Sequence, residues 1–135
     1  MIEKMHIQVK TALHSINSGG ASPWIGGRIY DTVGVADAIT PFMVWRFSAV
    51  EVVSYYGNDE EVVATVQVTT CTDWTAGTEY HLELIDDLST LRDYKAVVGT
   101  EIDRLTMRLI SIGDIRLEEN LLVSDTILEA KATRI

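Results

Sequence analysis

Segment 42–71 reads FMVWRFSAVEVVSYYGNDEEVVATVQVTTC, and its apolar residues recur at every second position on both sides of one polar turn. A period of two predicts β-strands that bury one face. In the first run, the face expected to meet the core carries Met43, Trp45, Phe47 and Ala49. In the second run, the corresponding face carries Val62, Ala64, Val66, Val68 and Thr70. Two such runs joined by the polar turn at 57–61 predict an antiparallel hairpin.

Helical spacing appears on both sides of this hairpin. In segment 2–17, one apolar stripe is formed by Ile2, Met5, Val9, Leu13 and Ile16. In segment 77–94, the stripe is formed by Tyr80, Leu84, Leu88 and Leu91, with His81 and Ile85 beside it. Apolar residues three and four apart predict an amphipathic helix in each segment. Asp73 or Thr75 is the expected N-cap of the second helix.

Two more alternating stretches follow the second helix. Residues 104–112 place Leu105, Met107 and Leu109 on one face, and residues 123–133 do the same with Leu128, Ala130 and Ala132. The expected order is a helix, a short extended piece at 28–31, the hairpin, a helix and two strands. This order predicts an α+β fold with two helices packed on one face of an antiparallel sheet. The chain has 135 residues, which is enough for a single domain over residues 1–135.

Composition disfavours two classes of partner. The chain has 11 basic and 20 acidic residues, a net charge of −9, whereas nucleic-acid-binding surfaces carry a basic stripe. No apolar run approaches the roughly 20 residues that a bilayer-crossing helix needs. The N-terminal MIEKMHIQVK has no apolar core of a signal peptide. We therefore expect a soluble protein that is made in a cytoplasm, with no membrane partner.

The residues that could carry chemistry are few and scattered. Cys71 is the only cysteine, so it forms no internal disulfide and lacks a second thiolate for zinc. Its place on the more polar face of the hairpin argues against deep burial. His6 and His14 are eight positions apart, too far along a helix to share a metal. His81 could pair with Glu79 or Asp73 as an acid and a base.

The glycine-containing stretch GGRIYD at 26–31 is not a phosphate loop. It lacks the lysine followed by Ser or Thr of a Walker A motif, and it follows a helix where a phosphate loop precedes one. We expect a turn that feeds an edge strand. No G-x-S-x-G sequence is present either. The sequence therefore predicts no catalytic, cofactor-binding or metal site, and the chain is not expected to be an enzyme.

A helix followed by GGRIYD, a loop and PFMVWRF resembles the bacteriophage tail-terminator family, also called tail-completion proteins. The residues that carry the resemblance are Gly27, Arg28, Ile29, Tyr30 and Asp31, then Pro41, Phe42, Val44 and Trp45. They cover the first third of the chain, and the rest agrees in the order of its elements. The resemblance implies a single tail-terminator-like domain that assembles into a homo-hexameric ring.

In that family role the ring caps the tail tube, ends tail polymerisation and joins the tail to the head connector. The implied partners are the tail tube protein on one side and a head-side connector or neck protein on the other. DNA passes through the ring without specific binding. No cofactor or catalysis is implied. The implied location is the virion neck at the head–tail junction, with assembly in the host cytoplasm.

A channel that conducts DNA should be acidic or neutral, because bound phosphates would slow transit. Fixed carboxylates repel the DNA backbone within a Debye length of about 8 Å. Two acidic clusters are candidates for the lumen or for a subunit contact. They are the turn Asn58, Asp59, Glu60 and Glu61, and the helix face Glu83, Asp86 and Asp87. The alternative is that both clusters are ordinary solvated surface.

Other functions stay open at this point. The chain could be another neck component, such as a head-closure or head–tail joining protein. It could also be a small α+β enzyme or ligand-binding domain with a pocket between helix and sheet, for which His81, Asp73 and Tyr30 are the polar candidates. A third possibility is a dimeric binding module that uses the edge of the hairpin.

Overall fold

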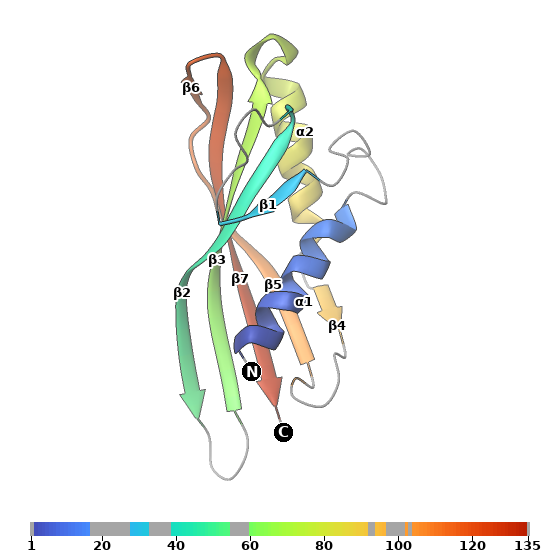
Figure 1. Cartoon of the computed structure of the whole chain (residues 1–135), viewed down its shortest axis with the longest axis vertical. Helices are drawn as coiled ribbons and strands as arrows, with labels where there is room; N and C mark the ends of the chain where they lie inside the picture. The colour runs from blue at the N-terminus through green and yellow to red at the C-terminus, as the bar shows by residue number, and fades with distance from the viewer. Residues whose placement is uncertain are drawn as a thin grey trace.

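The computed structural model describes residues 2–16, 28–32, 39–54, 60–91, 94–96, 102 and 104–134. Two helices, α1 (Ile2–Ser15) and α2 (Thr78–Ser89), lie against one twisted sheet (Figure 1). The main strands are β2 (Phe42–Ser54), β3 (Glu60–Asp73), β5 (Arg104–Ile112) and β7 (Leu121–Arg134). Three short strands complete it: β1 (Ile29–Asp31), β4 (Tyr94–Ala96) and β6 (Arg116–Glu118).

The sheet is mostly antiparallel. Its strands follow the order β1-β2-β3-β7-β5-β4, and β6 pairs separately with β7. The long strands β2, β3, β7 and β5 pair antiparallel with one another, and among the described strands only β1 and β2 pair in parallel. The predicted hairpin is confirmed, because β2 and β3 pair from Phe42 opposite Cys71 to Ser54 opposite Glu60.

Both helices cover the same face of the sheet. One apolar core joins side chains from α1, α2 and the four long strands, including Met5, Leu13, Trp45, Leu84 and Leu128, all with no exposed surface. On β3 the predicted core positions Val62, Ala64, Val66, Val68 and Thr70 are all buried. The predicted α+β fold with two helices on one face of an antiparallel sheet is confirmed.

On β2, one predicted core position is wrong. Ala49 is exposed, although Met43 and Trp45 are buried and Phe47 is half-buried. The register shifts between Phe47 and Ala49, so that Phe47 pairs with Val66 and Ala49 pairs with the next residue, Thr65. A one-residue bulge moves every later side chain to the opposite face. Beyond the bulge, Val50 and Val52 are therefore the β2 residues whose side chains point to the same face of the sheet as Trp45.

The connection between β3 and α2 also differs from the expectation. The strand runs on to Asp73 and a 3₁₀ turn, η3 (Trp74–Ala76), follows it. Asp73 caps this turn, since its carboxylate accepts hydrogen bonds from the backbone and hydroxyl of Thr75 at 2.9 and 2.6 Å. The N-cap of α2 is Gly77, and the helix ends at Ser89, before the predicted end at 94.

Arg28 and strand β1 tie the start of the sheet together. The Met43 backbone N–H donates to Arg28 O at 2.9 Å, and the Thr32 backbone N–H donates to Trp45 O at 2.6 Å. The Arg28 side chain also donates from Nε to Pro41 O at 3.0 Å. The predicted edge strand at this position is confirmed. Gly27 and the turn residues Asn58 and Asp59 lie outside the described residues.

Candidate functional site

Cys71 is buried, although its side chain points to the more polar face of the hairpin. It is 7% exposed, and burial is the main cause that raises the pKa of its thiol to about 11. The nearby carboxylates of Glu118 and Asp125 add to the rise. Cys71 pairs with Val123 on β7, and Val123 in turn pairs with Arg116 of β6. The argument from the sequence against deep burial of Cys71 was therefore wrong.

His81 is fully buried in the first half of α2. Its Nδ1 lies 2.8 Å from Thr72 Oγ1 on β3, and its Nε2 lies 2.8 Å from Ser124 Oγ on β7. The expected partner Asp73 instead caps η3, and Glu79 is exposed. Burial lowers the pKa of His81, so the ring is neutral, with one nitrogen donating and the other accepting. These contacts make His81 a link between helix and sheet.

The three polar candidates for a pocket between helix and sheet, Tyr30, Asp73 and His81, each contact different residues. Tyr30 is half-buried on β1, with its ring centroid 6.2 Å from that of Phe42. Asp73 contacts Thr75, and His81 contacts two strands. The contacts of His81 are with Thr72 and Ser124, so neither of its two possible acid–base pairs is formed among the described residues.

The acidic candidates on α2 fall into two environments. Glu83 and Asp86 are exposed, as expected for a solvated face. Asp87 is only 9% exposed, and its Oδ2 has no hydrogen-bond partner among the described residues. Burial, together with the neighbouring charges of Asp86 and Glu83, raises the pKa of Asp87. Asp87 therefore belongs to the rim of the core.

The described part of the acidic turn lies at the start of β3. Glu60 and Glu61 are half-buried there, and Glu61 Oε1 lies 3.6 Å from Lys131 Nζ on β7. Glu60 pairs with Ser54 and with Arg134, at the end of β3 opposite to η3. The two acidic clusters therefore come from separate parts of the fold.

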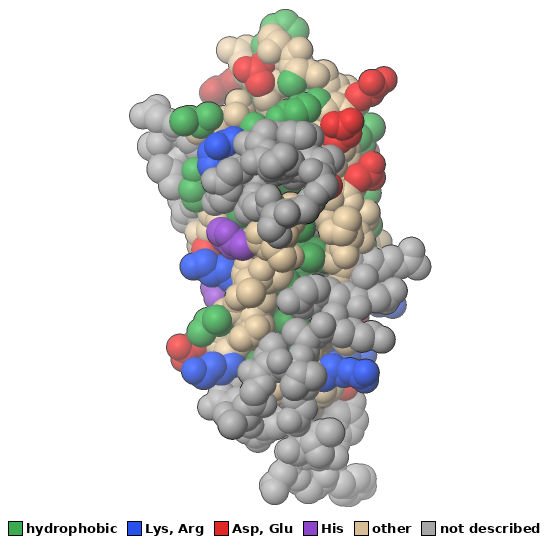
Figure 2. Space-filling view, turned by 90° about the vertical axis from the view of Figure 1, so that its right-hand side faces the viewer, with side chains coloured by type: hydrophobic (Ala, Val, Ile, Leu, Met, Phe, Trp, Pro, Cys, Tyr) green, Lys and Arg blue, Asp and Glu red, His purple; other side chains and the backbone are tan. Residues whose placement is uncertain are grey.

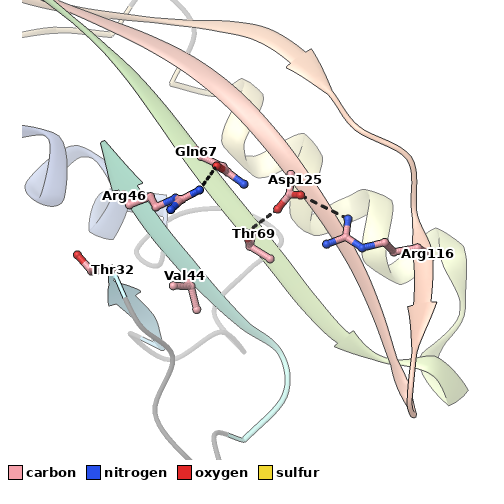
Figure 3. A pocket seen from close by; sticks show the side chains of 7 residues that line it. All are labelled: Thr32, Val44, Arg46, Gln67, Thr69, Arg116 and Asp125. Carbon is pink, nitrogen blue, oxygen red and sulfur yellow. Dashed lines mark hydrogen bonds and ion pairs between the residues drawn. The ribbon is translucent and has the colours of Figure 1, made fainter. Parts of the chain in front are cut away.

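The face of the sheet away from the helices carries a polar network that the sequence pattern did not single out. Arg46 on β2 donates to Gln67 Oε1 on β3 at 3.0 Å (Figure 3). Thr69 Oγ1 donates to Asp125 Oδ1 at 2.6 Å, and Arg116 Nη1 lies 3.4 Å from Asp125 Oδ2. Cross-strand pairing brings these side chains together from four strands, over sequence separations that no local motif spans.

This network lines a shallow hollow of about 310 Å³ on the helix-free face. Its walls are Thr32, Val44, Arg46, Gln67, Thr69, Arg116 and Asp125. Burial acts to raise the pKa of Asp125, but hydrogen bonds from Thr69 and Gln67 and the charge of Arg116 outweigh it and hold the pKa below its ordinary value. A carboxylate that is ionised and already hydrogen-bonded stabilises the sheet surface and leaves little for a ligand to satisfy.

Charge is unevenly distributed on the face of the molecule shown in Figure 2. In the view of Figure 2, most acidic side chains gather in the upper half and most Lys and Arg side chains in the lower half. The exposed acids of α2 are Glu79, Glu83 and Asp86, and the exposed lysines of α1 are Lys4 and Lys10. Such segregation lets one end of a subunit attract the oppositely charged end of another.

The described residues contain no group of three or more His, Cys, Asp or Glu side chains placed to hold a metal ion. Within the same ranges, neither helix is long and apolar enough to span a bilayer.

Comparison with known proteins gives a likeness in fold. No protein-family model matches the chain, and no curated protein matches it in sequence. Among solved structures, a chain from the virion of a native gene transfer agent particle has a similar fold, with a TM-score of 0.70. The two sequences are 16% identical, and the match covers 93% of this chain and 94% of that chain. Nearly the whole chain therefore shares the fold of a subunit of that virion.

Proposed function

We propose that this chain is a structural subunit of a phage-like virion and not an enzyme. The observation that carries the proposal is the fold likeness to a gene transfer agent virion chain over nearly the full length of both proteins. The buried positions of Cys71 and His81 support it, because both side chains serve the packing of the sheet. Fold alone does not define function, so the proposal needs its own test.

The more specific role that we propose is that of a tail terminator. Six copies close into a ring that caps the tail tube, ends its polymerisation and meets the head-side connector. The support is the GRIYD and PFMVWRF resemblance, together with a fold that matches a virion chain. A closed ring needs one heterologous contact that repeats around the axis.

Electron microscopy of assembled particles tests this role directly. Density for six copies at the head-proximal end of the tail tube is the expected result. Density for the chain within the connector, above the tube end, would instead support the alternative of a head-closure or head–tail joining protein. The absence of the chain from purified particles would overturn the structural role altogether.

We further propose that an acidic cluster lines the channel of the ring. Glu83 and Asp86 are exposed on α2, and Glu60 and Glu61 lie at the start of β3. Asp87 is a weaker candidate, since its side chain is largely covered in the subunit. Repulsion between carboxylates and phosphates would keep DNA from adhering during transit.

Charge reversal tests the channel proposal. One double variant combines Glu83→Lys with Asp86→Lys, and the other combines Glu60→Lys with Glu61→Lys. Both should assemble, and the variant whose cluster faces the channel should release DNA more slowly at low salt. The control is Glu3→Lys, an exposed acid on α1. DNA release that is unchanged in both double variants would place both clusters outside the channel.

A further inference from the structure

Among the described residues, no strand covers the outer edge of β2 over its second half. Strand β1 covers this edge only opposite Met43, Val44 and Trp45. Among the described residues no other strand pairs with β2 on that side, and Figure 1 shows its lower half at the margin of the sheet. Natural proteins usually protect such an edge with lysine, proline or a short strand. The open segment AVEVVS at 49–54 contains neither Lys nor Pro.

The backbone of this segment points outward at defined residues. Met43 N–H and Trp45 C=O bond to the β1 side, so these residues turn away from β3. Their partners on β3 are Thr70 and Val68, which therefore face β7. Because β3 pairs with β7 without a register shift, every second residue of β3 repeats this orientation.

The same alternation reaches the open segment of β2. Ala64 and Val62 face β7, so their partners Val50 and Val52 direct their backbone N–H and C=O groups to the open edge. The side chains of Val50 and Val52 are 41% and 50% exposed. An edge that combines free backbone groups with exposed β-branched side chains is a ready template for another strand.

At the opposite margin of the sheet, the described part of the chain leaves a second open edge, on β5. Strand β4 pairs with β5 only from Leu105 to Met107. Beyond that point β5 has a bulge between Leu109 and Ser111, and Ile110 and Ile112 are 47% and 48% exposed. Gly113 then donates its N–H to Asp125 O at 2.7 Å. By the same alternation, the backbone N–H and C=O groups of Leu109 and Ile112 point away from β7, toward a side of β5 where no described strand pairs with them.

The two open edges complement each other in direction and in chemistry. Each step from β2 through β3 and β7 to β5 is antiparallel, so β5 runs opposite to β2. Glu51 on β2 and Arg108 on β5 both lie on the helix-free face, and the Arg108 side chain is 62% exposed. On the face that carries the helices, the exposed apolar side chains are Val50 and Val52 at the β2 edge and Ile112 at the β5 edge. Opposite charges and apolar pairs across strands both stabilise sheet pairing.

We propose that the open edge of β2 pairs antiparallel with the open edge of β5 in a second copy of this chain. The sheet then continues from one subunit to the next, with Glu51 near Arg108 of the neighbouring copy. This contact joins different edges of identical subunits, so it is head-to-tail and can close into a ring. The inference rests on the proposed ring function and names the contact that builds it.

Proline at an outward N–H tests the contact. Val52→Pro removes a backbone donor that bonds to nothing within the described subunit, and proline is tolerated at such edge positions. The variant subunit should keep its circular dichroism spectrum and thermal midpoint, yet fail to form rings. Val52→Thr keeps both the N–H and the β-branched shape, and it should assemble as the wild type does. Rings formed equally well by Val52→Pro would overturn the proposal.

Cysteine cross-linking gives a second measurement that does not depend on the stability of the proline variant. Arg108→Cys is combined with Ala49→Cys, Glu51→Cys or Val53→Cys, because these three β2 residues share one face and sample neighbouring registers. Oxidation of assembled rings should give a ladder of covalent oligomers up to six in one combination. Each single variant should stop at dimers, and wild-type Cys71 is buried and should not cross-link.

Failure of the contact and failure of the ring are distinguishable. Particles that carry a wild-type ring, while none of the three double variants cross-links beyond dimers, would overturn the edge pairing and leave the proposed function standing. Particles in which the wild-type chain forms no ring would overturn the proposed function and this inference together. These readouts do not depend on which face of the sheet lines the channel.

Discussion

The two helices cover the same face of the sheet, but their interfaces differ in chemistry. Under α1 the contacts are apolar, with Met5, Val9 and Leu13 in one cluster with Met43 and Trp45. The sheet also buries four hydroxyl side chains on β3 and β7, which are those of Thr70, Thr72, Ser124 and Thr126. His81 meets this polar seam through Thr72 and Ser124.

The difference shows two ways of attaching a helix to a sheet. An apolar interface gains stability from the surface area that it removes from water, and this gain depends little on how the two elements are oriented. A buried polar seam gains little net stability, but it is costly to disturb, because a lost partner leaves a buried group unsatisfied. We therefore infer that His81 fixes the position of α2 along the sheet, while Leu84 and Leu88 hold α2 in the same apolar core as α1.

Removal of the Trp45 side chain should have the largest effect on stability. Trp45 is fully buried, and its ring centroid lies 4.7 Å from that of His6 on α1. Trp45→Ala should lower the free energy of unfolding by about 3–5 kcal/mol, as is usual for truncation of a core aromatic residue. Chemical denaturation monitored by circular dichroism measures this loss.

Trp45→Phe is the matched control. The Trp45 indole Nε1 is buried and has no hydrogen-bond acceptor among the described residues, so phenylalanine removes a polar group that is unsatisfied there. Its loss should be clearly smaller than that of Trp45→Ala. Equal losses would mean that the indole N–H, and not the apolar volume, holds this interface together.

His81→Ala should come next, with a loss of about 1–3 kcal/mol, because it leaves the hydroxyls of Thr72 and Ser124 without their partner. Hydrogen exchange of backbone amides should show the change concentrated in α2. The variant Tyr80→Ala, at the half-buried neighbouring position, serves as a comparison for the loss of a large side chain from the same turn of α2. Uniform exchange changes over α1 and α2 would contradict a positional role for His81.

The same histidine should make stability depend on pH. Burial lowers the pKa of His81 in the fold, so the unfolded chain binds the proton more readily. Its contribution is therefore complete above the ordinary histidine pKa of about 6.5 and is lost as pH falls from there toward the folded pKa. Thermal midpoints from pH 8 to pH 5 should fall less steeply for His81→Gln than for the wild type. Identical slopes would exclude His81 as the source.

Sequence periodicity predicted the fold because long amphipathic elements carry repeated signals. The core faces of β3 and β7 followed from spacing alone, and so did that of α1 apart from Ile2, which is exposed. Strands β1, β4 and β6 have three residues each, too few to establish a period. The bulge at Ser48 arises from the pairing of β2 with β3, and it is the reason why the prediction for Ala49 was wrong.

The buried histidine and the polar network could not be predicted in the same way, because tertiary contacts bring their members together. His81 lies nine residues from Thr72 and 43 residues from Ser124, and no local pattern joins them. The network of Arg46, Gln67 and Asp125 likewise exists only through cross-strand register. The sequence could identify acidic clusters, but it assigned Asp87 to the solvated face of α2, whereas the helix turns it toward the core.

Asp87→Asn should give the smallest effect, and it should be stabilising. The pKa of Asp87 is raised by burial and by the charges of Asp86 and Glu83, so the folded state disfavours its ionised form. The wild type therefore loses stability as pH rises through the folded pKa, whereas asparagine carries no charge to lose. At pH 7 the gain should be a few tenths of a kcal/mol up to about 1.

The pH dependence separates this charge effect from packing. The advantage of Asp87→Asn over the wild type should shrink as pH falls through the raised folded pKa of Asp87. It should be gone below the ordinary aspartate pKa of about 3.9, where both folded and unfolded chains hold the proton. Asp86→Asn, at an exposed neighbouring position, provides the control and should change stability less. If Asp87→Asn destabilises the chain at neutral pH, then the Asp87 carboxylate has a stabilising partner in the assembled or dissolved protein, and the rim of α2 is a contact in its own right.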